Sequence, residues 1–177
     1  GISPRSIPGT PGLEFVASTD EHDEYGNLIS DVFAGIDEYV EKRKKMHEKR
    51  MRKIWTMLEK EGVFKPDIEG EGADYYLVAF GSATLPAREA VKELNEQGLK
   101  FGLVSFSYLY PMDGAKVFEM LKGKKLIDVE YNYTAQLAQH IKTNSGISIE
   151  KMILKYDGEA FTPNEIAEKA KEIVKGW

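Results

Sequence analysis

Residues 75–82 read Tyr-Tyr-Leu-Val-Ala-Phe-Gly-Ser, and this short stretch decides the fold class. A continuous apolar run of this length is typical of a strand that is buried on both faces, as in a parallel sheet. Gly81 ends the run, and residues 84–97 continue with apolar residues at helical spacing until Gly98. The stretch therefore predicts a buried strand that is followed at once by a crossover helix.

The same alternation continues toward the C-terminus. Further strands are predicted at 101–106, 126–130 and 152–155, and further helices at 111–121, 134–143 and 162–175. Strands that alternate with helices at this spacing form right-handed crossovers, which give a parallel sheet with helices on both faces. We therefore predict a three-layer α/β domain with an open, mostly parallel sheet over residues 73–177.

Two segments precede this domain. Residues 1–30 are predicted to be an irregular connector loop, because prolines and glycines interrupt any regular pattern there. Residues 31–72 are predicted to hold one long helix, 31–61, and a linker. Lysine and arginine crowd residues 42–53 of this helix. Acidic flanks offset that charge, so we interpret the basic stretch as a solvated helix face.

Composition narrows the class of protein. The chain has 177 residues, a formal net charge of −5 and no cysteine. An acidic chain lacks the basic face that phosphate binding requires, which argues against a nucleic-acid partner. Without cysteine there is no disulfide framework and no thiolate ligand for zinc or an iron–sulfur cluster. No apolar run approaches the ~20 residues that span a membrane. We therefore expect a cytoplasmic globular protein that does not bind membranes.

The connector loop holds a dense polar cluster, in which Asp20, Glu21, Asp23 and Glu24 place four carboxylates around His22. Such a cluster suits a hard cation or an acid–base histidine, but its spacing matches no metal motif. We favour an acidic loop that pairs with a basic surface such as residues 42–53. Arg5 has the fork geometry to clamp a carboxylate or phosphate. We interpret it chiefly as an anchor that fixes the loop.

Polar residues also follow two of the predicted strands: Ser82 follows the first, and Glu130, Asn132 and Gln136 follow the third. Ligands of open α/β sheets bind at such carboxyl strand ends. The dinucleotide glycine pattern and the P-loop lysine are both absent, so we interpret Ser82 or Thr84 as a helix cap, with Gly81 easing the turn. The other three residues suit helix capping and partner binding equally well. No nucleophile–base set is evident, so we assign no catalytic or metal-binding residue, and any cofactor-binding residue stays unknown.

Several short motifs occur in order along the chain. They are Gly1-Ile-Ser-Pro-Arg-Ser-Ile-Pro-Gly9, Glu21-His-Asp-Glu24, Gly26, Lys42-Arg43, Phe80-Gly81-Ser82, Tyr108-Leu109-Tyr110-Pro111, and Val129-Glu-Tyr-Asn-Tyr-Thr-Ala-Gln-Leu137. In this order they resemble the α subunit of 2-oxoacid:ferredoxin oxidoreductases, and the 2-oxoglutarate type in particular. The resemblance covers nearly the whole chain. One departure is Ala135, where the family pattern favours glycine before Gln-Leu.

The resemblance implies a domain like the C-terminal domain of transketolase, with one antiparallel edge strand that would come from residues 62–70. The full enzymes of this family use thiamine diphosphate, magnesium and iron–sulfur clusters to decarboxylate a 2-oxoacid, form an acyl-CoA and reduce ferredoxin. The resemblance implies that this chain alone binds none of these cofactors. Its expected partners are an upstream thiamine–pyrimidine domain and a β subunit, which make it part of a hetero-oligomer.

The role that the resemblance implies is therefore structural: a C-terminal α-subunit region that packs the thiamine domains and is inactive alone. In this role the connector loop leaves the missing domain and docks onto the α/β domain through Arg5 and the polar cluster. The absence of an initial methionine fits a fragment or a processed piece. Two alternatives stay open, namely a stand-alone ligand-binding module and a protein-interaction module that uses residues 42–53. The sequence does not choose among 2-oxoglutarate, pyruvate and branched-chain oxoacids.

Overall fold

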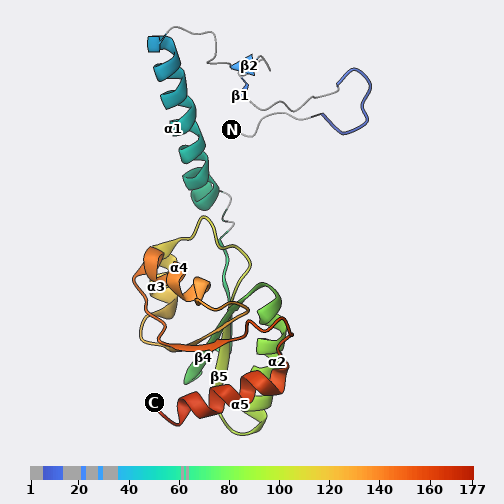
Figure 1. The fold of residues 1–177 in the computed structure, drawn as a ribbon, viewed down its shortest axis with the longest axis vertical. Helices are drawn as coiled ribbons and strands as arrows, with labels where there is room; N and C mark the ends of the chain where they lie inside the picture. The colour runs from blue at the N-terminus through green and yellow to red at the C-terminus, as the bar shows by residue number, and fades with distance from the viewer. Residues whose placement is uncertain (1–5, 14–20, 23–27, 30–35, 61, 63) are drawn as a thin grey trace. The chain divides into compact units, whose positions relative to one another are not determined.

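A computed structural model describes residues 6–13, 21–22, 28–29, 36–60, 62 and 64–177 (Figure 1). The chain divides into two compact units, Gly1–Lys53 and Ile54–Trp177. In the first unit, β1 (Glu21–His22) pairs with β2 (Leu28–Ile29) in an antiparallel ladder. Helix α1 spans Ile36–Lys60, within the predicted 31–61. The predicted domain boundaries after residues 30 and 72 stay predictions.

The second unit is built on one five-stranded sheet in the order β3-β5-β4-β6-β7. Its strands are β3 (Asp67–Glu69), β4 (Tyr75–Phe80), β5 (Phe101–Phe106), β6 (Lys125–Glu130) and β7 (Lys151–Leu154). Strand β3 pairs antiparallel with β5, and all other pairs are parallel. The predicted mostly parallel sheet is confirmed, as is an antiparallel edge strand drawn from residues 62–70.

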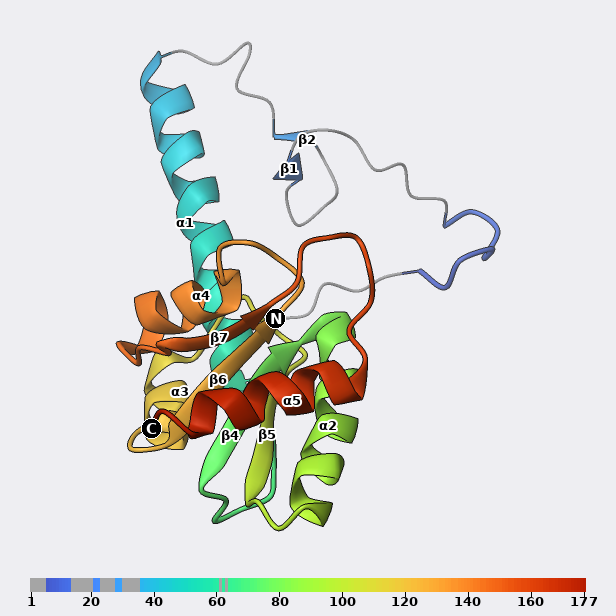
Figure 2. The ribbon, with the colours of Figure 1, turned by 60° about the horizontal axis from the view of Figure 1, so that its bottom comes forward.

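Helices cover both faces of this sheet (Figure 2). They are η1 (Gly81–Ala83), α2 (Thr84–Glu96), α3 (Gly114–Leu121), α4 (Gln136–Ser145) and α5 (Pro163–Val174). Helices α2 and α5 contact each other on one face, and α3 and α4 contact each other on the other. The layers confirm the three-layer α/β architecture. None of the helices in the described ranges is both long and apolar enough to cross a membrane.

Strand β4 shows why a continuous apolar run forms the centre of the sheet. Its Leu77 and Ala79 belong to the core under α2 and α5. Tyr76 and Val78 belong to the core under α3 and α4. All four side chains are buried, because successive residues of a strand point to opposite faces and both faces are covered.

Two helix starts differ from the predictions by a few residues. Helix α3 begins at Gly114 rather than at residue 111, because the Asp113 side chain accepts a hydrogen bond from the Lys116 N–H and forms the N-cap. Helix α4 begins at Gln136 rather than at residue 134. Its N-cap, Ala135, has φ 52°, in the left-handed region that glycine adopts without strain. Ala135, where the family pattern favours glycine, therefore has a backbone conformation that suits glycine better than alanine.

Candidate functional site at the carboxyl edge of the sheet

The carboxyl ends of parallel strands meet at one edge, and this edge holds the four polar residues singled out within the α/β domain: Ser82, Glu130, Asn132 and Gln136. Ser82 follows β4 within η1, and Glu130 ends β6. Ser82 is exposed and makes no cap: Ala83 is the N-cap of α2, with no side-chain cap hydrogen bond. The predicted cap by Ser82 or Thr84 is therefore wrong.

Glu130 holds the start of α4. Its side chain is fully buried, and its Oε1 accepts hydrogen bonds from the backbone N–H of Leu137 at 2.8 Å and Ala138 at 3.3 Å. Its Oε2 accepts a bond from Asn132 Nδ2 at 2.6 Å, and Asn132 Oδ1 accepts one from the Gln136 N–H at 3.3 Å. A carboxylate on the free N–H groups of a helix also suits the positive end of its dipole. The three polar residues that follow β6 thus come together as a helix cap, with Gln136 taking part through its backbone.

Asp128 lies two residues before Glu130 on the same face of β6 and was not singled out from the sequence. It is fully buried, and neither of its carboxyl oxygens has a hydrogen-bond partner in the described ranges. Burial, and to a smaller extent the neighbouring Glu130 carboxylate, raise the pKa of Asp128 to about 9. At neutral pH Asp128 is therefore a neutral acid whose O–H can donate to Glu130. The sequence signal was an aspartate in the middle of a strand, between Ile127 and Val129.

We expect Glu130→Gln to lower the free energy of unfolding by about 2 kcal/mol, because a charged acceptor on two helix N–H groups becomes a neutral amide. Urea denaturation at pH 7 measures this loss. Glu150→Gln, at an exposed position before β7, is the matched control and should leave stability within about 0.5 kcal/mol. Equal stability of the two variants would contradict the capping role.

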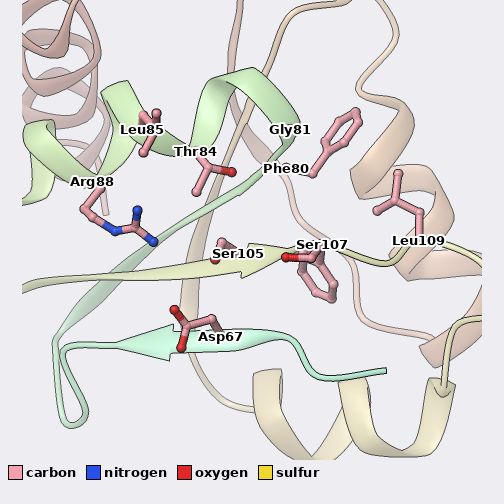
Figure 3. A pocket seen from close by; sticks show the side chains of 10 residues that line it. Asp67, Phe80, Gly81, Thr84, Leu85, Arg88, Ser105, Ser107 and Leu109 are labelled. Carbon is pink, nitrogen blue, oxygen red and sulfur yellow. The ribbon is translucent and has the colours of Figure 1, made fainter. Parts of the chain in front are cut away.

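A pocket of about 440 Å³ opens between α2 and the β3–β5 edge (Figure 3). Its polar lining comes from Asp67 of β3, from Thr84 and Arg88 of α2, and from Ser105 and Ser107 at the end of β5. Sequence reasoning missed the pocket, since β3 and β5 meet α2 only through tertiary contacts.

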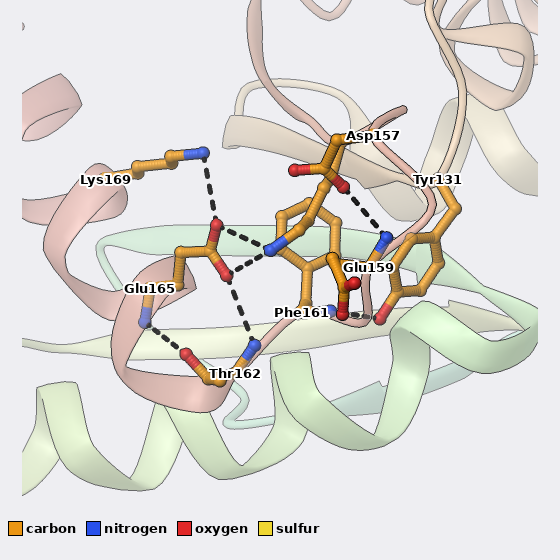
Figure 4. Close-up of polar contacts among 8 residues, drawn as sticks. Tyr131, Asp157, Glu159, Phe161, Thr162, Glu165 and Lys169 are labelled. Atoms are coloured by element: carbon orange, nitrogen blue, oxygen red, sulfur yellow. Dashed lines mark hydrogen bonds and ion pairs between the residues drawn. The ribbon is translucent and has the colours of Figure 1, made fainter.

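The start of α5 is fixed by a second polar cluster (Figure 4). Lys155 Nζ donates to both carboxylate oxygens of Glu165, at 2.9 and 2.8 Å. The hydrogen bond raises the pKa of Lys155 and lowers the pKa of Glu165. Thr162 and Glu165 form a reciprocal capping box, and the Tyr131 hydroxyl accepts a bond from the Phe161 N–H at 2.6 Å. These contacts join the β6 loop to α5 and are structural.

The remaining predicted site residues lie in the first unit. Arg5, Asp23 and Glu24 fall outside the described residues, and Glu21 and His22 form β1. Residues 64–177 contain one histidine, His140. Its Nε2 lies 2.7 Å from the Leu109 carbonyl oxygen, so it is not paired with a serine or threonine hydroxyl that it could activate. Across the described part of the chain, no group of three histidine or acidic side chains is placed to hold a metal ion. The described geometry therefore defines an α/β domain whose sheet edge carries helix caps and an open pocket.

Known proteins that are similar to this chain contain the same kind of α/β domain. Residues 73–166 match the family model of pyruvate:ferredoxin oxidoreductase core domain II. The 2-oxoacid:ferredoxin oxidoreductase subunit alpha of Saccharolobus solfataricus is 32% identical over 179 residues, which cover 99% of this chain and 27% of that protein. The chain therefore belongs to the family of 2-oxoacid:ferredoxin oxidoreductase α subunits. It spans about a quarter of the length of the curated relative.

Solved structures support the same fold. A 2-oxoglutarate:ferredoxin oxidoreductase from Magnetococcus marinus, solved with 2-oxoglutarate, coenzyme A and succinyl-CoA bound, is 29% identical. It superposes with a TM-score of 0.70 over 97% of this chain and 28% of that one. A transketolase from Pichia stipitis is 23% identical, with a TM-score of 0.50 over 64% of this chain and 18% of that one. The latter similarity concerns the fold alone, and it agrees with the predicted transketolase-like domain.

Proposed function

We propose that this chain is the structural C-terminal region of an α subunit and that it assembles a 2-oxoacid:ferredoxin oxidoreductase without doing chemistry itself. The observation that carries the proposal is the use of the edge carboxylate. Glu130, the buried ionisable group best placed to serve a ligand, has both oxygens engaged by α4 and Asn132. A carboxylate whose two oxygens already accept hydrogen bonds from its own helix and a neighbouring side chain is not available as an acid, a base or a ligand.

Two observations support the proposal that this chain alone holds none of the cofactors of such an enzyme. There is no cysteine to hold an iron–sulfur cluster. Among the described residues, no group of three histidine or acidic side chains is placed to hold a metal ion such as the magnesium that accompanies thiamine diphosphate. We propose that an upstream thiamine–pyrimidine domain and a β subunit hold these groups. The whole enzyme would convert a 2-oxoacid to an acyl-CoA and reduce ferredoxin. We propose 2-oxoglutarate as that acid, supported by the ligands of the Magnetococcus marinus structure.

Exposed tyrosines give the proposed assembly a contact surface. Tyr133 and Tyr156, which are 70% and 65% exposed, lie edge to face with ring centroids 4.9 Å apart. Tyr108 and Tyr110, in the segment after β5, are also exposed. Aromatic side chains are enriched in protein interfaces, where they bury a large area at a small entropic cost. We propose that Tyr133 and Tyr156 contact another domain or subunit. Docking of the connector loop through Arg5, Glu21, His22, Asp23 and Glu24 belongs to the same proposal.

The test is a double substitution, Tyr133→Ser with Tyr156→Ser, in the α subunit that contains this chain, co-expressed with its β subunit. We expect subunit affinity to fall at least tenfold, since loss of a buried aromatic contact costs more than about 1.4 kcal/mol. Turnover of 2-oxoglutarate per assembled enzyme should stay unchanged. Size-exclusion chromatography and ferredoxin reduction measure the two quantities separately.

Phe118→Ser, on the exposed surface of α3, is the matched control and should leave assembly intact. Full assembly with lost turnover in the tyrosine double variant would overturn the non-catalytic role. Turnover of pyruvate or a branched-chain oxoacid in preference to 2-oxoglutarate would overturn the substrate assignment alone.

A further inference from the structure

The chain contains two Asp-Gly pairs, Asp113-Gly114 and Asp157-Gly158. In such a pair the backbone nitrogen of the glycine can close a ring on the side chain of the aspartate, because glycine has no Cβ to block the approach and its backbone adopts many conformations. The two pairs have the same covalent chemistry. The structure around each pair therefore decides which of them reacts.

The Asp113-Gly114 pair is held by the start of α3. Asp113 Oδ1 accepts the Lys116 N–H at 3.0 Å, and the Asp113 carbonyl oxygen accepts the Val117 N–H at 3.0 Å. Gly114 also lies so close to α4 that an added Cβ would come within 1.9 Å of the Asn144 carbonyl oxygen. Ring closure at Asp113 would have to break the helix cap and move α3 away from α4.

The Asp157-Gly158 pair lies in the loop between β7 and α5 (Figure 4). Both residues are exposed, and apart from the chain neighbours no atom lies within 4 Å of the position that a Gly158 Cβ would take. Asp157 Oδ1 accepts the Glu159 N–H at 3.0 Å. A turn of this kind folds the carboxyl group back over the backbone that follows it. Among the described residues, no hydrogen bond holds the Gly158 N–H. This pair is therefore free to close a ring.

We propose that Asp157 is a site of spontaneous modification, at which the Asp157-Gly158 linkage isomerises to isoaspartate while Asp113-Gly114 stays intact. The Gly158 nitrogen attacks Cγ of Asp157 and forms a new N–C bond, and a carboxyl oxygen leaves as water. Water then adds to the five-membered succinimide. Cleavage of the new bond restores aspartate, and cleavage of the original peptide bond leaves a main chain that runs through Cβ and Cγ. One water leaves and one is added, so neither mass nor oxidation state changes.

The modification alters the aromatic surface beside it, and this step rests on the proposed function. Tyr156 directly precedes Asp157, and its ring centroid lies 4.9 Å from that of Tyr133. Isoaspartate adds one atom to the main chain next to Tyr156, which displaces this ring from its partner. We therefore expect modified chains to bind their partner subunit more weakly.

The test follows isoaspartate in the folded 177-residue chain during incubation at mildly acidic pH. A protein-isoaspartate methyltransferase with labelled S-adenosylmethionine marks each isoaspartate, and peptide mapping locates it. We expect isoaspartate to accumulate at least about tenfold faster at Asp157 than at Asp113, because the helix cap must open before Asp113 can react. In denaturing urea the two rates should agree within about twofold, since both loops are then unfolded. Equal rates in the folded chain, or accumulation at Asp157 in urea alone, would overturn the proposal.

Two matched variants assign the signal. Asp157→Ser removes the carboxyl group but keeps an oxygen that can accept the Glu159 N–H, so it should abolish the label in this loop without changing the urea midpoint. Asp113→Ser keeps a capping oxygen at α3 and should retain the full label at Asp157. A label of unchanged size in Asp157→Ser would overturn the site.

The effect on assembly is tested separately, in the α subunit that contains this chain. The subunit is aged and then mixed with its β subunit, and assembled and unassembled fractions are separated by size-exclusion chromatography. Isoaspartate at residue 157 should be at least about twofold enriched in the unassembled fraction, and Asp157→Ser should assemble fully after ageing. Equal isoaspartate in the two fractions would overturn the link to assembly. That result is distinct from the tyrosine double substitution, which tests the proposed function itself.

Discussion

The free energy of unfolding of this protein is expected to fall steeply as pH rises from 5 to 8, and Asp128→Asn should abolish most of that fall. The pKa of Asp128 rises from an ordinary 3.8 to about 9 in the folded protein. Between these values the folded state holds a proton that the unfolded chain has released. Stability is therefore highest below the unfolded pKa, and each pH unit above it costs about 1.4 kcal/mol until the folded group ionises near pH 9.

The asparagine variant isolates this single group, because it keeps the shape of the side chain and cannot ionise. Urea denaturation of both proteins at pH 5, 6, 7 and 8 gives the two slopes. We expect the difference in stability between them to change by about 4 kcal/mol over this range, in favour of the variant at pH 8. Asp74→Asn, at an exposed position before β4, is the control and should follow the parent protein. Parallel curves for Asp128→Asn and the parent would show that Asp128 is already ionised in the fold.

The same strand shows how far the sequence could predict the structure. The alternation of strands and helices predicts a strand at residues 126–130, and the structure has β6 there. The burial of Asp128 and Glu130 could not be predicted, since it depends on α4 lying over that face. Its place at a strand end marks Glu130 in the sequence. Nothing in the sequence marks Asp128 as buried, because a polar residue in the middle of a strand usually faces solvent.

The pocket shows what the sequence could not predict. Gly81-Ser82 marks the junction of β4 and α2, at an edge where ligands of open sheets bind. The charged and hydroxyl residues that line the pocket there come from three elements and include Asp67, Arg88 and Ser105. Their meeting depends on the register of a three-residue edge strand against β5. No local pattern encodes that register, because register is fixed by burial and by neighbouring strands.

Gly114 supports a prediction of similar size that rests on sterics alone. It is the first residue of α3, and it approaches the last turn of α4. A Cβ added there would lie 1.9 Å from the carbonyl oxygen of Asn144 and 2.8 Å from its carbonyl carbon. Both atoms are backbone, so no side-chain rotation can relieve the overlap. The φ of Gly114 is one that other residues also adopt, so backbone conformation does not require glycine there. The requirement comes from the packing of α3 against α4, which the sequence does not show.

We therefore expect Gly114→Ala to lower the free energy of unfolding by at least about 3 kcal/mol, near the upper end of overpacking effects. Relief requires α3 and α4 to separate, and the buried Val117 and Ile141 would lose packing as they do so. Urea denaturation measures the loss. Gly176→Ala is the matched control, because its Cβ would meet no atom closer than 3.7 Å. A Gly114→Ala variant as stable as this control would mean that the two helices are not packed as closely as the structure places them.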